Sequence, residues 1–265
     1  MSALLPVRMV AKPWGRDVLP EPFTAPPGER IGEIWFEPPP AFSQLLVKYI
    51  FTSDKLSVQL HPSDAQLPGH GKEECWLVID AEPGASLGIG FREPLAREAM
   101  RAAALDGSIE QLLDWHPVRA GDFFYIPAGT VHAIGDGISL IEVQQTSDVT
   151  YRLYDYGRPR ALHLDEGIGV ALGEPHDPDL RRHVAPGASD TLVDGPIFRL
   201  DMVAGEPRPA SLSGFGTSAV LAIPVSGAIT VDGEAIAPGN CALARSVAVI
   251  DFAGGGTCLV AQPCM

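Results

Sequence analysis

Short apolar runs rich in β-branched and aromatic residues recur along the chain, separated by glycine and proline. In the first half these runs cover residues 33–37, 44–51, 56–60, 75–79, 122–126, 139–144 and 149–154. They resume in the second half at 196–202, 218–225, 228–231, 241–244, 247–252 and 257–261. Many short strands at this spacing are typical of a β-sandwich or β-barrel. Val231-Asp232-Gly233-Glu234 predicts a hairpin within the second series. The pattern therefore predicts an all-β protein built in two parts.

Two segments depart from the strand pattern and predict helices. Residues 93–115 are rich in alanine, leucine and arginine, and Asp106-Gly107 divides them into two short helices. Residues 163–172 predict another helix, which Gly173 would end. Residues 174–189 contain three prolines and mixed charges and predict a linker. We therefore expect a first domain over residues 1–173 with a helical insertion, and a second domain over residues 190–265.

The charge of the chain narrows the classes of partner. Its 265 residues include 33 acidic and 19 basic side chains, which gives a formal net charge of −14. So acidic a chain lacks the broad positive surface that nucleic acids or anionic membranes require. An anionic substrate would need a few local cations acting against the overall field.

The four cysteines neither form a CxxC pair nor suggest a disulfide framework. The apolar start is too short for a signal peptide, and no apolar run reaches the length of a membrane span. These features predict a soluble, reduced, cytoplasmic protein. The sequence leaves its oligomeric state open.

Two segments in the first half carry polar side chains at strand spacing. Side chains alternate along a strand, so Ser57, Gln59 and His61 share one face. Lys72 and Glu74 share a face in the same way, just before an apolar strand. The first segment could instead be a surface strand that ends at Pro62. Lys72 and Glu74 could instead form an exposed ion pair, as most such pairs do.

A more specific pattern runs from Gly121 to His132. It consists of glycine, five residues, Pro127-x-Gly129, two residues and His132, and it matches most of the second cupin motif. Pro127 and Gly129 predict a tight turn, after which a strand would carry His132 into a small barrel. We interpret His132 as a metal ligand rather than as a core histidine.

Downstream, Glu142 and Gln144 share one face of an apolar strand, and Arg152 lies among tyrosines. Charged groups in such runs must face outward or be paired inside. Two imidazoles, a carboxylate and an amide oxygen make a plausible zinc site, with the amide the weakest ligand of the set. The candidate ligands are Gln59, His61, Glu74 and His132.

Taken together, these motifs resemble the type I mannose-6-phosphate isomerases of the cupin superfamily, in their short bacterial form. The matching stretches lie between residues 12 and 160: Lys12-Pro13-Trp14-Gly15, Gly32 to Trp35, Leu56 to Pro62, Lys72 to Trp76, Gly121 to Ala133, and Ile141 to Tyr156. The resemblance implies a bicupin, two small β-barrels of which the second lacks ligands. It also implies one Zn²⁺ per chain, held by the four candidate ligands, and interconversion of mannose 6-phosphate and fructose 6-phosphate.

The same resemblance implies roles for further residues. Lys72, Glu142 and Arg152 match the family's active-site lysine, glutamate and arginine, and Ser57 and Trp14 are expected to bind substrate together with Lys72 and Arg152. We expect Glu142 to remove the C–H proton, Lys72 to act on an oxygen proton and Arg152 to hold phosphate. Gly71 stands where some long-form members have a histidine. Two alternatives stay open, a cupin dioxygenase with iron and a non-enzymatic cupin that binds a sugar phosphate.

Overall fold

A computed structural model describes residues 3–206 and 212–264. The strands of the first half are β2 Val7–Arg16, β3 Ile31–Phe36, β4 Leu45–Phe51, β5 Val58–Leu60, β6 Glu74–Ala81, β7 Ser86–Phe91, β8 Leu113–Pro117, β9 Asp122–Ile126, β10 His132–Ile134, β11 Ile138–Gln145, β12 Tyr151–Tyr154 and β13 Arg181–His183. The other strands are β1 Ala3–Leu4, β14 Asp190–Asp194, β15 Phe198–Ala204, β16 Val220–Ser226, β17 Ile229–Val231, β18 Glu234–Ile236, β19 Ala242–Ala244, β20 Ile250–Asp251 and β21 Thr257–Pro263. The helices are α1 Arg97–Asp106, α2 Ile109–Leu112 and α3 Leu164–Val170, with 3₁₀ turns η1 Pro40–Phe42, η2 Pro178–Leu180 and η3 Val247–Val249.

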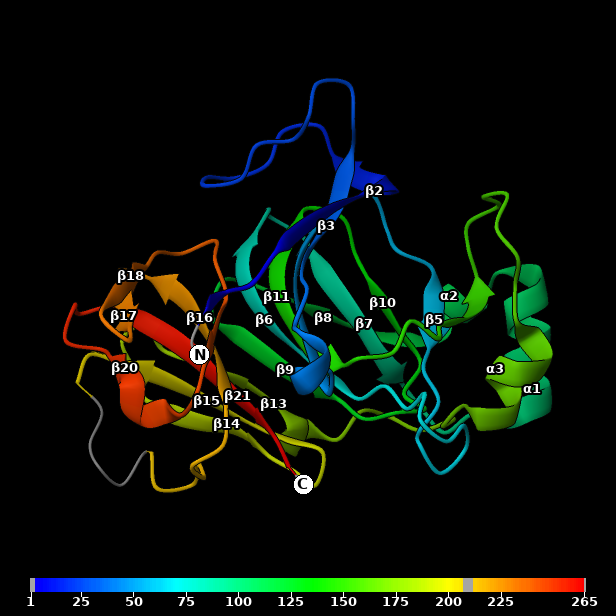
Figure 1. Cartoon of the computed structure of the whole chain (residues 1–265). Coiled ribbons are helices and arrows are strands. Elements are labelled where there is room, and N and C mark those ends of the chain that lie inside the picture. The colour runs from blue at the N-terminus through cyan, green and yellow to red at the C-terminus, as the bar shows by residue number, and fades with distance from the viewer. Residues whose placement is uncertain (1–2, 207–211, 265) are drawn as a thin grey trace.

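The strands build two β-bodies that lie side by side (Figure 1). In the first, a sheet ordered β13-β9-β6-β11-β4-β3-β2 is accompanied by a sheet ordered β12-β5-β10-β7-β8. In the second, the orders are β1-β19-β16-β21-β15-β14 and β18-β17-β20. The strand pairs of these sheets are antiparallel. The all-β class predicted from the sequence is confirmed.

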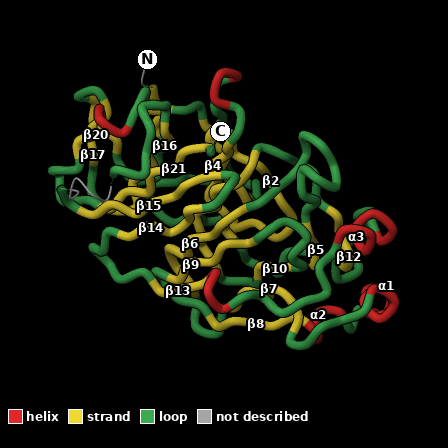
Figure 2. Tube along the Cα trace, turned by 90° about the horizontal axis from the view of Figure 1, so that it is seen from below, coloured by secondary structure: helices red, strands yellow, loops and turns green. Residues whose placement is uncertain are grey.

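The helices lie at the end of the first body that is remote from β17 and β20, as two views show (Figures 1 and 2). The predicted break at Asp106-Gly107 separates α1 from α2, and Gly107 has a positive φ of 83°, which suits glycine. The predicted insertion ends too late, because Leu113 to Trp115 belong to β8. The helix α3 ends at Val170, before Gly173. No helix in the described ranges is long and apolar enough to cross a membrane.

Several boundaries differ from the sequence prediction because strands formed by non-local pairing carry weak local signals. Segments β2, β7, β8 and β14 were not expected as strands, whereas residues 247–249 form a 3₁₀ turn in place of a strand. The expected linker contains β13, which pairs with β9 of the first body. Conversely, β1 pairs with β19 of the second body. The division at 173 and 190 stays a proposal.

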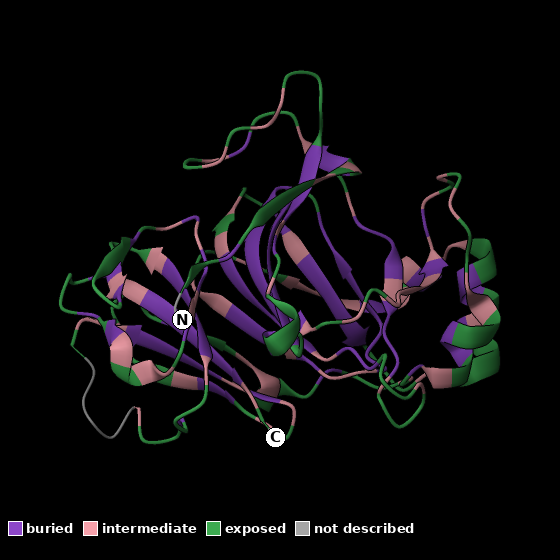
Figure 3. Ribbon diagram, in the orientation of Figure 1, coloured by how far each residue is buried: buried purple, intermediate pink, exposed green. Residues whose placement is uncertain are grey.

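The predicted hairpin joins β17 to β18, with Val231 paired to Glu234. Asp232 and Gly233 both have positive φ, 49° and 84°, as a tight two-residue hairpin turn requires. Buried residues fill the strands of both bodies, and exposure concentrates on loops and on the outer helix faces (Figure 3). One hydrophobic cluster joins the two halves, since Phe36 and Tyr49 belong to it together with Phe198 and Leu259.

Candidate active site and metal centre

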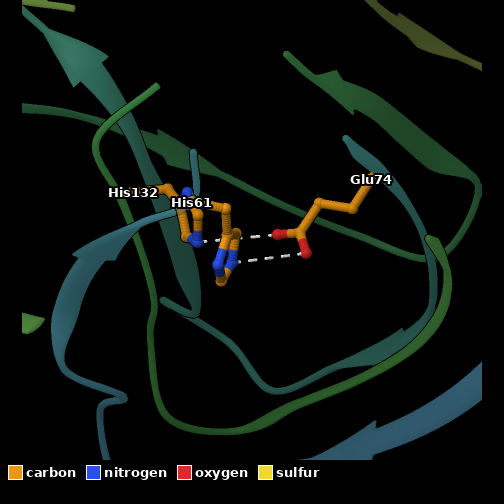
Figure 4. A group of neighbouring side chains, drawn as sticks. All are labelled: His61, Glu74 and His132. Carbon is orange, nitrogen blue, oxygen red and sulfur yellow. Dashed lines mark ion pairs between the residues drawn. The ribbon is translucent and has the colours of Figure 1, made fainter. Parts of the chain in front are cut away.

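Three side chains from separate motifs meet inside the first body. His61 follows β5, Glu74 begins β6 and His132 begins β10, and each is 1–2% exposed. Their ligand atoms all lie within 4.8 Å of one another. Figure 4 shows both imidazoles turned toward the carboxylate, with Nε2 of His61 3.6 Å from Oε2 of Glu74 and Nε2 of His132 3.5 Å from Oε1. A surface-strand interpretation of residues 56–62 is therefore wrong.

The hydrogen bonds of the two histidines fix which ring nitrogen faces Glu74. Nδ1 of His61 lies 2.8 Å from the carbonyl of Val149, and Nδ1 of His132 lies 2.9 Å from that of Thr130. A carbonyl can only accept, so both Nδ1 atoms carry the proton and both Nε2 atoms present lone pairs. Burial lowers the pKa of His132 to about 4 and that of His61 well below its usual value. Two neutral imidazoles and a carboxylate converge as a divalent metal requires.

Gln59 lies beside this cluster and pairs with His132 across β5 and β10. Its amide nitrogen is 3.5 Å from Nε2 of His132, and its oxygen accepts a hydrogen bond of 2.9 Å from the Ser57 hydroxyl. In this orientation the amide presents a donor to the cluster, and half a turn of the amide would present its oxygen instead. The role of Gln59 as a fourth ligand stays a prediction.

Lys72 lies between the His–Glu–His cluster and Glu142. Its Nζ lies 2.7 Å from Oε2 of Glu74, 3.2 Å from Nε2 of His61 and 3.9 Å from Oε1 of Glu142. Lys72 is 6% exposed, so the Lys72–Glu74 pair is not the exposed ion pair that local spacing allowed. Burial alone would lower the pKa of Lys72, but Glu142 and Glu74 outweigh it and raise that pKa. Burial also raises the pKa of Glu74 to about 7, against the opposing effect of Lys72.

Glu142 is anchored by both carboxylate oxygens. Oε1 accepts a 3.0 Å bond from Lys48, and Oε2 accepts a 3.1 Å bond from the Trp76 indole. Burial would raise the pKa of Glu142, but Lys48 and Lys72 outweigh burial and lower it to about 2. The alternative that Glu142 is a structural partner of Arg152 is wrong, since its cationic partners are Lys48 and Lys72.

Sequence reasoning missed Lys48, although a signal for it was present. It is the one charged residue in the apolar run Leu45–Phe51, and it is 6% exposed. A buried charge within a strand must have a partner. Lys48 has two such partners, because it donates hydrogen bonds to Glu142 and to the amide oxygen of Gln144. Its ammonium also lies 4.6 Å from the centre of the Trp35 ring.

These groups border a cavity of about 430 Å³. The predicted substrate residues Trp14, Ser57 and Arg152 all line it. So do charged and aromatic residues to which the sequence analysis gave no role: Lys12, Glu33, Trp35, Lys48, Arg160 and His163. The structure therefore brings the predicted site residues to one cavity, except His61 and His132, which lie beside Glu74 but do not line it. The roles of all these residues remain predictions.

Arg152 lies directly opposite Gln59 in the pairing of β12 with β5. Its NH1 donates a 3.1 Å hydrogen bond to the carbonyl of Ala161. Among the described residues, no carboxylate lies within ion-pair distance of Arg152; the nearby Asp155 pairs with Arg158 and Arg160. The alternative that Arg152 merely neutralises Asp148 or Asp155 therefore has no ion pair to support it.

Gly71 has a local reason to be glycine. A Cβ atom there would lie 2.5 Å from the backbone nitrogen of Asp64, and the Gly71 amide donates a 2.9 Å bond to the Asp64 carboxylate. The chain thus packs too closely at this position for a histidine.

Comparisons with known proteins support the resemblance drawn from these motifs. The chain is 43% identical over 166 residues to mannose-6-phosphate isomerase of Streptococcus mutans, covering 58% of this chain and 52% of that one. It is 40% identical over 161 residues to mannose-6-phosphate isomerase ManA of Bacillus subtilis, covering 54% and 51%. These matches span about half the length of the curated relatives. No family model matches the chain.

Solved structures extend the likeness in fold to the whole chain. The crystal structure of a Bacillus subtilis mannose 6-phosphate isomerase superposes with a TM-score of 0.75 at 22% identity, covering 98% of each chain. A zinc-bound mannose 6-phosphate isomerase superposes with a TM-score of 0.75 at 14% identity, covering all of both chains. The predicted bicupin fold is confirmed.

Proposed function

We propose that the protein is a zinc-dependent isomerase that interconverts mannose 6-phosphate and fructose 6-phosphate. The observation that carries this proposal is a buried His–Glu–His cluster whose Glu74 lines one cavity together with Lys72, Glu142 and Arg152. Its relatives are named as isomerases of this kind. They do not favour the dioxygenase or the non-enzymatic sugar-binding protein.

His61, Glu74 and His132 would hold one zinc ion per chain, with Gln59 as the fourth ligand. Zinc in such a site acts as a Lewis acid that polarises or orients sugar oxygens. The backbone carbonyls of Val149 and Thr130 hold the two imidazoles in the tautomer that leaves Nε2 free to bind.

Two residues share the proton chemistry. The reaction removes the proton from C2 of mannose 6-phosphate, forms an enediol and returns a proton to C1. Glu142 is ionised at neutral pH, because Lys48 and Lys72 lower its pKa, and would take the C2 proton. Lys72 keeps its proton, because Glu142 and Glu74 raise its pKa, and would donate to the sugar oxygen on which negative charge develops.

The rest of the cavity would bind and orient the sugar. Arg152 would offer two parallel donors to phosphate oxygens, whereas Ser57 and Trp14, which line the same cavity, would contact the sugar.

A coupled assay for fructose 6-phosphate formed from mannose 6-phosphate, run with and without a chelator, tests this proposal. Activity that a chelator abolishes and Zn²⁺ restores is the expected result. Oxygen uptake by an iron-loaded protein would support a dioxygenase instead. Binding of the sugar phosphate without exchange of its C2 proton into solvent would support a non-enzymatic sugar-phosphate-binding protein instead.

A further inference from the structure

The loop that follows β12 brings a second arginine to the cavity. Residues 155–163 leave the strand and return to the start of α3, and both Arg160 and His163 line the same cavity as Arg152. The quoted motifs end at Tyr156, so they include neither Arg160 nor His163. Two arginines that line one cavity are notable in a chain with a net charge of −14.

Asp155 holds Arg160 in a fixed direction. Its carboxylate is 2% exposed and accepts bonds from Nε of Arg160 at 2.6 Å and from NH2 at 2.5 Å. Arg158 donates to the same carboxylate at 3.2 Å and also pairs with Asp54 at 2.6 Å. A bidentate arginine–carboxylate pair fixes the plane of the guanidinium as well as its position. Arg160 therefore reaches the cavity wall with little rotamer freedom left to lose on binding.

Arg152 lacks the hydrogen-bond partners that Arg160 has. Its Nε is buried and has no hydrogen-bond partner within the described ranges, and only NH1 is bonded, to a carbonyl. Burial and the positive charge of Arg160 both lower the pKa of Arg152. Two positively charged side chains that line one cavity form an arrangement that a bound anion would stabilise.

His163 adds a third donor. The backbone N–H of Arg152 donates to Nδ1 of His163 at 3.2 Å, so this nitrogen must be the acceptor. The ring proton of the neutral imidazole is then on Nε2. Two arginines and this histidine thus line one cavity, on elements that hydrogen bonds tie together.

We propose that Arg160, positioned by Asp155, is a second phosphate-binding residue that acts with Arg152 and His163 on the phosphate monoester of the substrate. This inference rests on the proposed function, because it assumes that the ligand is a sugar phosphate. It makes Asp155 a positioning residue and explains how an acidic protein recognises a dianion.

Titration calorimetry on the zinc-loaded protein tests the proposal, with mannose 6-phosphate, inorganic phosphate and mannose as separate probes. Arg160→Gln should weaken binding of both phosphates at least ~10-fold, which is ~1.4 kcal/mol, and leave mannose binding unchanged. Arg160→Lys should recover only part of the affinity, since an ammonium cannot form the guanidinium fork. Asp155→Asn should raise the KM for mannose 6-phosphate while kcat at saturation stays near that of the wild type.

Arg101→Gln is the matched control, because Arg101 pairs with exposed Asp165 on the helices and does not line the cavity. Its affinity for all three probes should equal that of the wild type. Wild-type affinity for mannose 6-phosphate in folded Arg160→Gln and Arg160→Lys would overturn the proposal, as would failure of the wild type to bind either phosphate. A wild type that binds mannose 6-phosphate through Arg160 but does not isomerise it would overturn the proposed function and leave this site standing.

Discussion

At the scale of single residues, the tautomers of His61 and His132 determine what the site can bind. Each Nδ1 donates to a backbone carbonyl, so each Nε2 faces Glu74 as a lone pair. In a histidine that only fills a hydrophobic core, a buried Nε2 lone pair next to a carboxylate would be unfavourable. The arrangement leads to a direct prediction about metal content.

The purified protein should carry about one divalent ion per chain, and His61→Ala or His132→Ala should each lose it, because too few of the roughly four zinc ligands remain. Elemental analysis of the purified variants measures the occupancy. His183→Ala is the control, since His183 pairs with Asp122 and does not line the cavity. Full occupancy in both ligand variants would show that the metal is held elsewhere.

Glu142→Gln should retain zinc and bind substrate but lose isomerase activity, because an amide cannot accept a proton. Hydrogen–deuterium exchange at C2 of mannose 6-phosphate measures the proton-transfer step itself. The Trp76 indole, which donates to Glu142 in the wild type, can equally donate to an amide oxygen, so the substituted side chain should stay in place. Normal exchange in this variant would transfer the base role to Lys72 or to a metal-bound water.

Arg152→Ala should reduce kcat/KM for mannose 6-phosphate at least ~10-fold, because charge-assisted bonds contribute about 1.5–3 kcal/mol each. Action on unphosphorylated mannose should change little, and Arg152→Lys should restore only part of the loss. Steady-state kinetics on both sugars gives the comparison. Equal losses on the two sugars would mean that Arg152 does not bind the phosphate.

At the scale of elements, the large sheet of the first body carries a row of side chains across its strands. Trp35 pairs with Lys48 across β3 and β4, Lys48 pairs with Glu142 across β4 and β11, and Glu142 pairs with Trp76 across β11 and β6. Directly opposite side chains on one face contact each other. The row therefore holds a buried ion pair between two indoles, and the strand register fixes its order.

Lys48→Met should lower the free energy of unfolding at pH 7 by about 3–5 kcal/mol, because it leaves Glu142 buried without its closest cation. In the wild type the pKa of Glu142 falls from 4.5 to about 2 on folding, so its contribution to stability is complete above about pH 4.5 and is lost as the pH falls toward 2. The difference in the free energy of unfolding between wild type and variant should therefore become smaller as the pH falls from about 4.5 toward 2. Denaturant unfolding from pH 7 to pH 3 measures it.

Lys55→Met provides the control for this experiment. Lys55 pairs with Glu110 at 2.6 Å, but its side chain is 42% exposed. Exposed pairs contribute about 0–1 kcal/mol, so this variant should lose little stability. An equally small loss in Lys48→Met would show that the buried pair is dispensable for the fold.

At the scale of the whole molecule, the second half supports the first through a shared core. Phe198 of β15 is fully buried and packs on Tyr125 of β9, with ring centres 5.9 Å apart. Within the described ranges, the second half contributes no residue to the lining of the cavity. We therefore propose that residues from about 190 onward contribute stability rather than chemistry.

Phe198→Ala should lower the free energy of unfolding by about 3–5 kcal/mol, as large-to-small core substitutions do, while the folded variant keeps its kcat. Glu234→Ala, on the exposed hairpin strand β18, should change neither quantity. Thermal or denaturant unfolding combined with turnover below the transition tests both. A large loss of turnover in folded Glu234→Ala would show that the second body reaches the reaction.

Local sequence patterns were sufficient to predict the fold class, most of the strands, the hairpin at Asp232-Gly233 and the motifs that carry His61, Glu74 and His132. These features follow from local rules, since hydrophobic alternation, turn residues and fixed motif spacing are visible within a few positions of the chain. The same rules marked Lys72, Glu142 and Arg152 only as charges within or beside apolar strands, and the resemblance to a known family implied their active-site roles.

The partners of those charges, in contrast, depend on the tertiary structure. Lys48 and Glu142 are 94 residues apart in sequence, and strand register alone makes them neighbours. Arg160 was identified only from the structure, in which it lines the same cavity as Arg152. Likewise, the pairing of β13 with β9 and of β1 with β19 joins segments that the expected domain boundaries at 173 and 190 would separate. Local patterns show that a strand forms and which side chains share its face, but its neighbours depend on long-range packing, which no short window of sequence contains.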